Sequence, residues 1–249
     1  WLQSSRAGAY IGYTLILVYT GRTYFKTVFA KALLLDRARR SENVEEDDER
    51  VSVLAARVLL LALAGFVLAL SWVFQSWTMA VFFSLLLMTM FLVLSRIICE
   101  TGVPFLQSNW YPGDILLRLF GPAAIGPVAL PALLWCGGIF AQDPRECLMP
   151  YVATGLKAAE DAGLKLRRLF WIVVGAVAIA LVVAFFSSTY YLYNFNPMSD
   201  GYAAVYPPQD YLNQTARSFN AMKASGVFEA SQAASPLGRL AMTRANPME

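Results

Sequence analysis

Long apolar segments limit what this chain can fold into more strongly than any other feature. Four stretches are almost wholly apolar, and three of them have roughly the 18–23 residues that a helix needs to cross a bilayer. Apolar residues make up 57% of the 249 residues and charged residues 15%, whereas an average soluble domain is about 45–50% apolar and about 25% charged. The sequence therefore predicts an all-α, polytopic bundle of transmembrane helices.

The apolar segments divide the chain into a membrane domain and a polar tail. Residues 1–195 form the transmembrane domain and residues 196–249 form the tail. We expect about five spans, which lie at residues 7–21, 54–73, 77–98, 123–141 and 169–191. In the tail, a helix is expected over residues 210–225, with its apolar face formed by Leu212, Ala216, Phe219 and Met222. Residues beyond Ala230 are expected to be mobile or bound to a partner.

Positive charge predicts which loops face the cytoplasm. Residues 22–50 carry seven Lys and Arg residues, and residues 142–168 carry five. The positive-inside rule places both loops in the cytoplasm and the tail on the other side of a bacterial inner membrane. Because the third span already ends in the cytoplasm, one crossing at 123–141 cannot lead to a second cytoplasmic loop. Either residues 103–141 enter and leave the membrane as a re-entrant or broken pair, which we favour, or the rule fails once.

Three segments of these loops have patterns of their own. Residues 22–34 place Arg22, Lys26 and Lys31 beside regularly spaced apolar residues, which predicts an amphipathic helix near lipid headgroups. Residues 145–168 predict a second amphipathic helix on the cytoplasmic side. Five consecutive acids at residues 45–49 are expected to form a solvated loop between two helices, with a cation or partner site as the alternative.

Charged and polar residues near lipid are the candidate functional groups, because ionisable side chains at membrane depth are costly. The candidates for a substrate or ion pathway follow the third span: Arg96, Glu100, Asn109, Trp110, Asp114 and Arg118. The four charged residues form two pairs with i, i+4 spacing, so each pair can meet on one helix face. The alternative is an interfacial charge network through which nothing passes.

Helix-breaking residues lie next to these charges. Gly102 and Pro104 must interrupt the helix, and Pro127 and Pro131 predict a discontinuous or kinked helix over residues 121–141. A broken helix end exposes N–H and C=O groups that transporters use to hold ions or substrate charges. A discontinuous helix lining a cavity and a kinked structural helix both remain open.

Small residues predict where helices pack closely. Gly65 and Ala69 are four residues apart in the second span, and Ala176, Ala180 and Ala184 form a ladder in the last one. Such spacing lets two helix backbones approach. We therefore expect the partners to be the lipid bilayer and other membrane protein chains, in a homo- or hetero-oligomer.

The composition excludes several function classes. The chain has no His and three Cys without a CxxC pattern, so we expect no metal site and no cofactor beyond bound lipid. It has no phosphate-binding loop and a net charge of only +3, which leaves nucleotide and nucleic-acid binding unsupported. We expect it not to be an enzyme. The chain begins at Trp1 rather than Met, so we expect it to be processed, truncated or the ordered part of something longer.

One segment supports a family resemblance. Residues 96–104 read R-x-x-x-E-x-G-x-P, which resembles a signature of uncharacterised bacterial multi-spanning membrane proteins. Those proteins also have segments similar to Gly8-Ala9-Tyr10 and Asp143-Pro144-Arg145. Residues 154–168 and the helix after them are similar to a part of oligopeptide transporters of the OPT type.

The resemblance covers about residues 7–195 and implies that the chain matches the C-terminal part of longer proteins. It implies a transporter of small peptides or solutes, or a fragment of one. The alternative is a non-catalytic subunit that packs on a larger membrane complex and stabilises it, or binds pigment, lipid or quinone between helices.

Overall fold

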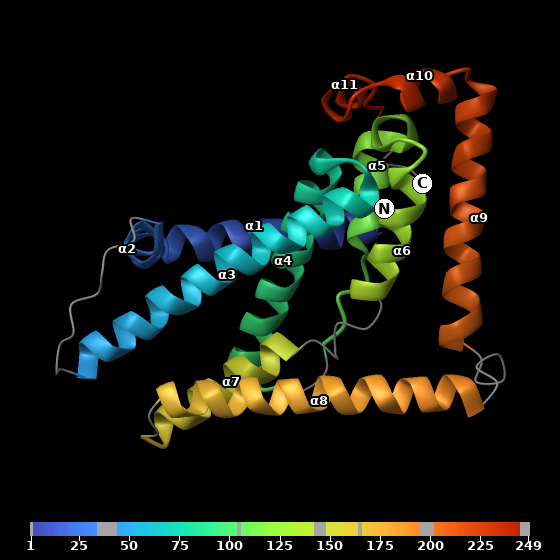
Figure 1. The fold of residues 1–249 in the computed structure, drawn as a ribbon. Coiled ribbons are helices and arrows are strands. Elements are labelled where there is room, and N and C mark those ends of the chain that lie inside the picture. Colours follow the sequence, from blue (N-terminus) through green and yellow to red (C-terminus); the bar gives the residue numbers. More distant parts are fainter. Residues whose placement is uncertain are drawn as a thin grey trace.

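Every regular element in the described part of the chain is an α-helix. The computed structural model describes residues 2–33, 44–103, 106–141, 148–163, 166–194 and 202–244 (Figure 1). The helices are α1 (Leu2–Thr20), α2 (Arg22–Leu33), α3 (Val44–Phe74), α4 (Trp77–Thr101), α5 (Pro112–Ile125), α6 (Ala129–Ala141), α7 (Leu148–Asp161), α8 (Leu166–Asn194), α9 (Tyr202–Ala224), α10 (Phe228–Ala233) and α11 (Pro236–Leu240). The all-helical fold class is thus confirmed.

Three helices are long and apolar enough to cross a membrane. They contain the segments Val53–Phe74 in α3, Trp77–Thr101 in α4 and Trp171–Tyr191 in α8, which coincide with three of the predicted spans. The segment expected to cross at residues 7–21 lies in α1, which is not among the three. Helix α6 has 13 residues and so reaches only about 20 Å, less than the roughly 30 Å of a bilayer core. The count of five spans therefore stays a prediction.

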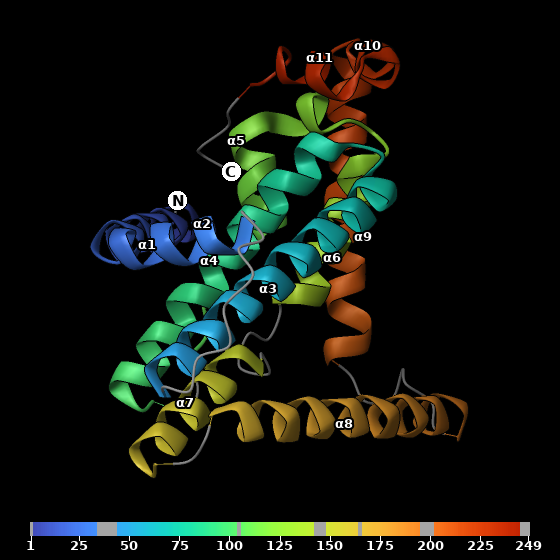
Figure 2. The ribbon, with the colours of Figure 1, turned by 60° about the vertical axis from the view of Figure 1, so that its left-hand side comes forward.

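Helix α4 forms the centre of the molecule. It packs against α1, α3, α5, α6, α7 and α11, and Figure 2 shows it running beside α3. Phe74 at the end of α3 meets Phe83 of α4 edge to face, with 5.6 Å between ring centroids, and both side chains are fully buried. Buried apolar area of this kind is the main stabilising term in a packed core.

Helices α5 and α6 are a broken pair. Gly121 (φ 77°) interrupts α5, and Gly126 (φ 93°) ends it; both angles lie in the region that favours glycine. Helix α5 leads away from the α7 end of α4 towards α10 and α11, and α6 returns (Figure 1). The chain thus enters and leaves along the same side of α4. Pro131, expected to break the helix, instead lies within the first turn of α6, where a proline is tolerated.

The described part of the tail, residues 202–244, packs on this broken pair, although residues beyond Ala230 were predicted to be mobile or bound to a partner. The Ser231 hydroxyl donates to the Ala123 carbonyl oxygen at 2.7 Å. The i+4 residue of Ala123 is Pro127, which has no N–H, so Ser231 replaces the missing helical donor. The Arg244 N–H donates to the Phe120 carbonyl at 3.1 Å, beside the interruption at Gly121. Helices α10 and α11 therefore cap one end of the α5–α6 pair.

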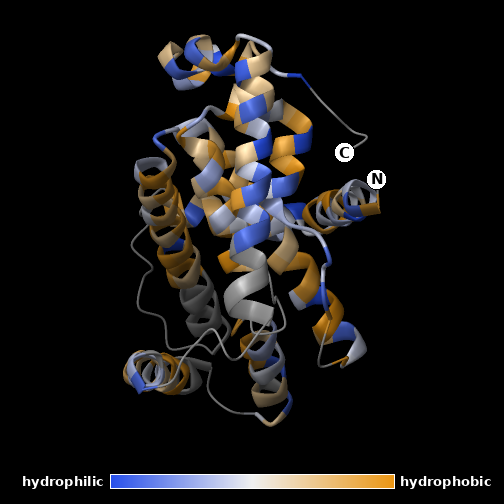
Figure 3. Ribbon diagram, turned by 90° about the vertical axis from the view of Figure 1, so that its right-hand side faces the viewer, coloured by the Kyte–Doolittle hydropathy of each residue, from blue (hydrophilic) through white to orange (hydrophobic). Residues whose placement is uncertain are grey.

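Two more expectations need correction. The acidic residues 45–49 do not form a loop, because their backbone belongs to the start of α3; acids are favoured there by the positive end of the helix dipole. On α9 the predicted apolar face is half right: Phe219 and Met222 pack on the core, whereas Leu212 and Ala216 are exposed. Tyr211 and Thr215 complete the packed face in their place. Figure 3 shows hydrophilic and hydrophobic residues alternating along the coloured part of α9, residues 209–224. Pro104 and residues 142–147, where a helix start was expected, lie outside the described residues.

The small-residue faces are exposed in the single chain. Gly65 and Ala69 on α3 and the three ladder alanines on α8 have open surfaces, and a Cβ added at Gly65 would meet nothing within 4 Å. Helix α8 runs across the base of the molecule and makes its main contact with α7 (Figure 1). Whatever these faces pack against lies outside the described chain.

Candidate functional site

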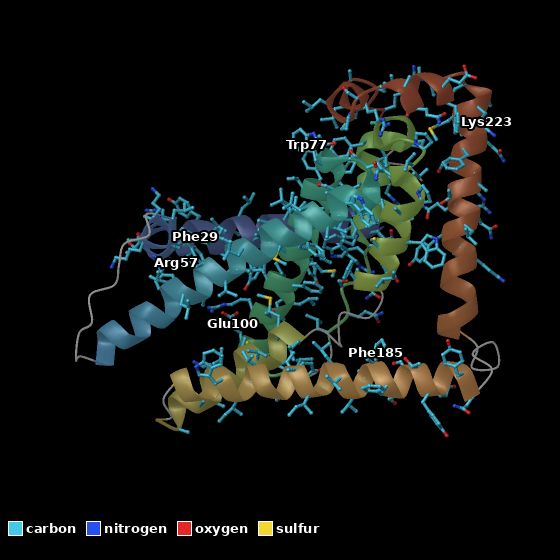
Figure 4. All side chains as sticks on the ribbon, in the orientation of Figure 1. Phe29, Arg57, Trp77, Glu100, Phe185 and Lys223 are labelled. Atoms are coloured by element: carbon cyan, nitrogen blue, oxygen red, sulfur yellow. The ribbon has the colours of Figure 1, made fainter. Side chains whose placement is uncertain are left out.

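The expected charged cluster divides into two separate pairs. Arg96 and Glu100 lie near the α7 end of α4 (Figure 4). The Arg96 Nη2 and Glu100 Oε1 atoms are 2.6 Å apart, and the side chains are 55% and 48% exposed. Asp114 and Arg118 lie on α5. No ion pair within the described residues joins the two pairs. The half-exposed pair on α4 has the properties of a surface salt bridge, which contributes little to stability.

Asp114 is positioned by the start of α5. Tyr111 is the N-cap with extended backbone angles, Pro112 is the first helical residue, and Asp114 lies in the first turn. A carboxylate is favoured there by the helix dipole. From α9, Gln214 Nε2 donates to Asp114 Oδ1 at 3.5 Å. Asp114 therefore links the broken pair to the tail helix.

Gly138 of α6 lets the Tyr211 side chain of α9 approach the site. A Cβ at Gly138 would overlap the ring of Tyr211 from α9. Because glycine has no side chain, the Tyr211 ring lies directly against α6. Together Asp114, Arg118, Tyr211 and Gln214 make what we call the α5–α9 polar site.

Burial controls the ionisation of this site, which lies outside the three candidate spans. Burial raises the pKa of Asp114 above its ordinary value, whereas the Gln214 hydrogen bond and the Arg118 charge lower it. Burial also raises the pKa of Tyr211 to about 12, helped by the charges of Tyr111, Asp114 and Asp210. The Tyr211 phenol therefore keeps its proton at neutral pH and can act as a donor.

Arg118 has an unmet hydrogen-bonding capacity. It follows Asp114 by one helical turn, yet no ion pair within 4.0 Å joins them among the described contacts. Its Nη1 atom is buried and has no hydrogen-bond partner. Buried polar atoms are nearly always paired in folded proteins, so an unpaired one needs an explanation such as an absent ligand or water.

Asn109 and Trp110 have structural surroundings. Trp110 is fully buried and meets Tyr10 of α1 edge to face at 5.6 Å between centroids. Asn109 has a positive φ of 54°, and its carbonyl accepts from Arg6 Nη1 at 3.5 Å. These contacts fix the segment before α5 against α1. Gly102, in the left-handed conformation with φ 68°, ends α4 just before it.

The sequence prediction does not include Tyr211 or Gln214, because the polar composition of the tail indicates a unit separate from the membrane domain. A usable signal is present: Tyr211, Thr215 and Met222 have helical spacing, and Gly226 follows Met222 by four residues. Among the described residues, no group of three or more Cys, Asp or Glu is placed to hold a metal ion.

Comparison with known proteins places the chain in one family. The model of a family of unknown function (DUF6785) matches residues 1–243. No curated protein matches the chain, and no solved structure does. These comparisons show no similarity to oligopeptide transporters.

Proposed function

The chain belongs to this DUF6785 family, and we propose that it is the part of a membrane transporter that binds small zwitterionic solutes, such as short peptides. In this proposal the α5–α9 polar site binds the solute, and the chain needs no cofactor and catalyses no reaction. The membrane is a bacterial inner membrane, with loops 22–50 and 142–168 on the cytoplasmic side and the tail on the other.

One observation carries the proposal: a carboxylate and a guanidinium one turn apart that do not satisfy each other. Asp114 is mostly withdrawn from solvent, and the buried Nη1 of Arg118 lacks a partner. A guanidinium binds carboxylates through parallel N–H donors, and a carboxylate attracts an ammonium group. The spacing therefore suits a solute that carries both charges. The site also adjoins a broken helix pair, the kind of element that transporters use at substrate sites.

Uptake into proteoliposomes tests this function. The probe is radiolabelled trialanine, with the purified chain reconstituted alone and together with any chain that copurifies with it. Asp114→Asn and Arg118→Gln each remove one of the two charges, and we expect uptake to fall at least about tenfold, the equivalent of about 1.4 kcal/mol of solute binding.

Glu100→Gln is the matched control, because Glu100 lies on the exposed α4 pair. We expect it to leave uptake unchanged at equal protein levels. Unchanged uptake in both α5 variants contradicts the proposal. So does the absence of trialanine uptake in every reconstitution of the unsubstituted chain.

A second function is favoured by the exposed α8 ladder: a non-catalytic subunit that stabilises a larger membrane complex. None of the most apolar window of α8 is buried in the chain, and close helix packing in membranes uses small residues of this kind. Ala180→Leu fills the ladder, and Ala178→Leu adds the same bulk on another face of α8.

Native mass spectrometry in mild detergent distinguishes these variants. We expect Ala180→Leu to reduce assembly with a partner chain or a second copy, and Ala178→Leu to preserve it. A monomer in all three proteins, or equal loss in both variants, contradicts the subunit function. Loss of assembly together with normal trialanine uptake by the unassembled chain would show that transport does not need the assembly.

A further inference from the structure

We propose that the corner between α1 and α2, from Tyr19 to Lys26, binds the headgroups of anionic phospholipids. The position of α2 is the first argument. Val28 and Ala32 of α2 pack with Val53 and Ala56 of α3 in a small buried cluster. Val53 is the first residue of the candidate span in α3. Helix α2 therefore lies level with the end of a span, where lipid headgroups meet the hydrocarbon core.

Arg57 fixes α2 at this level. Its Nε donates to the Ala32 carbonyl at 3.2 Å, and its Nη2 donates to the Lys31 carbonyl at 3.3 Å. These two carbonyls belong to the last turn of α2, which lacks helical donors of its own. Figure 4 shows Arg57 of α3 facing α2, and Figure 1 shows α2 almost along its axis while α3 crosses the picture. Helix α2 thus crosses the end of the span, as a helix lying on a membrane surface does.

The charge of this region matches an anionic surface. Residues 2–33 contain four cations, Arg6, Arg22, Lys26 and Lys31, and no Asp or Glu. Arg22 and Lys26 are exposed and four residues apart, so they lie on one face of α2. Neither helix carries a carboxylate of its own beside Arg22 and Lys26, so the phosphate groups of anionic lipids are suitable counter-ions for this exposed pair.

Aromatic side chains also favour a position of the α1–α2 corner at the level of the lipid headgroups. The Arg22 guanidinium carbon lies 4.4 Å from the centroid of the Tyr19 ring. The Tyr24 and Phe25 rings meet edge to face with 6.0 Å between their centroids, and the centroids of the Phe25 and Phe29 rings are 6.4 Å apart. Tyrosine rings are enriched at the headgroup level because one end is apolar and the other polar. Cations and aromatic rings together therefore favour an anionic lipid over a soluble anion.

Lipid titration tests this surface without relying on the transport proposal. The full chain in detergent is titrated with dioleoylphosphatidylglycerol or dioleoylphosphatidylcholine, and bound lipid is counted by native mass spectrometry. We expect the anionic lipid to bind more tightly. Arg22→Gln with Lys26→Gln is expected to weaken phosphatidylglycerol binding by about 25-fold, about fivefold per cation, and to leave phosphatidylcholine binding unchanged.

Two variants serve as controls. Arg22→Lys with Lys26→Arg keeps both charges and is expected to retain phosphatidylglycerol binding. Arg217→Gln with Lys223→Gln removes two exposed cations from α9 and is expected to retain it as well. The proposal is overturned if the α2 glutamine variant binds phosphatidylglycerol as the unsubstituted chain does. It is also overturned if the α9 variant loses as much binding, since net charge alone then explains the effect.

Discussion

Helices α4 and α8 are nearly equal in length and hydropathy, but the chain surrounds them very differently. Of the most apolar window of α4, 44% is buried, whereas none of the α8 window is. Helix α4 packs against six other helices, whereas α8 makes its main contact with α7. The comparison shows that an apolar sequence predicts a span but does not predict what covers it.

The two helices also satisfy their polar groups in the same way. Ser84 and Ser95 of α4 donate to the carbonyls of Ala80 and Phe91, four residues earlier. Thr189 of α8 donates to Phe185 with the same spacing. Hydroxyls that bond to their own helix need no partner from a neighbour, so they fit both settings. The difference between α4 and α8 therefore lies in apolar packing. Its contribution to stability can be measured as the change in unfolding free energy on substitution.

Removing an aromatic ring from each helix should give the largest contrast. Phe83→Ala on α4 leaves a cavity among Phe74 and Phe140, and we expect it to lower the free energy of unfolding by about 3–5 kcal/mol. Phe185→Ala on α8 removes a ring that is 67% exposed, so the expected change is about 0.5 kcal/mol or less. Unfolding of the detergent-solubilised chain in sodium dodecyl sulfate measures both values.

A large loss in Phe185→Ala would contradict this contrast and would show that α8 is packed in the solubilised protein. In that case the partner would be a second copy of the chain, and native mass spectrometry would find a dimer. A small loss in Phe83→Ala would contradict the central position of α4.

Adding a methyl group should give a smaller contrast. A Cβ at Gly113 would lie 2.8 Å from the Leu133 carbonyl oxygen of α6. Because that atom is backbone, α5 and α6 must move apart, and we expect Gly113→Ala to cost about 1–3 kcal/mol. Gly175→Ala on α8 would meet nothing within 4 Å and should stabilise the helix by roughly 0.5–1 kcal/mol. An equal decrease of the thermal midpoint in both variants would contradict the close contact between Gly113 of α5 and the Leu133 carbonyl of α6.

The sequence predicts where the apolar segments lie, but it does not predict which other segments pack against them. Apolar length predicts the three candidate spans within a few residues, since it depends on one segment at a time. The interruption of residues 121–141 is also local, because Gly121, Gly126 and Pro127 lie within the segment that they break. What the sequence could not give was the partner of each exposed group, which comes from another part of the chain.

The tail shows why this second kind of information was missing. Its polar composition predicts a separate unit whose residues beyond Ala230 are mobile or bound to a partner. The polar atoms instead replace donors that the broken pair lacks, as Ser231 does at Ala123. The predicted apolar face of α9 is correct at Met222 and wrong at Leu212, which is 56% exposed, because a weakly amphipathic pattern does not reveal which side of the helix has a neighbour.

The replacement of a missing donor can be measured by deleting one hydroxyl. Ser231→Ala leaves the Ala123 carbonyl without a donor beside Pro127, and Ser231 itself is fully buried. We expect a loss of about 1–3 kcal/mol, the cost of an unsatisfied buried polar group. Ser188→Ala on the exposed surface of α8 is the control, with an expected change within about 0.5 kcal/mol. Equal stability of Ser231→Ala and the unsubstituted chain would mean that the carbonyl finds water instead.

The smallest effect is expected at the exposed end of α4. A substitution there tests whether burial of the side chain, rather than its position on α4, determines the loss of unfolding free energy. Glu100→Gln removes the carboxylate that pairs with Arg96, and both side chains are about half exposed. An i, i+4 pair on a helix surface is worth about 0.3–0.5 kcal/mol at low salt, and added salt screens it. The difference in unfolding free energy between Glu100→Gln and the unsubstituted chain should therefore shrink towards zero at about 1 M salt, where the screening length is about 3 Å. A salt-independent loss above about 1.5 kcal/mol would contradict the exposure of this ion pair. It would show that something outside this chain covers the end of α4.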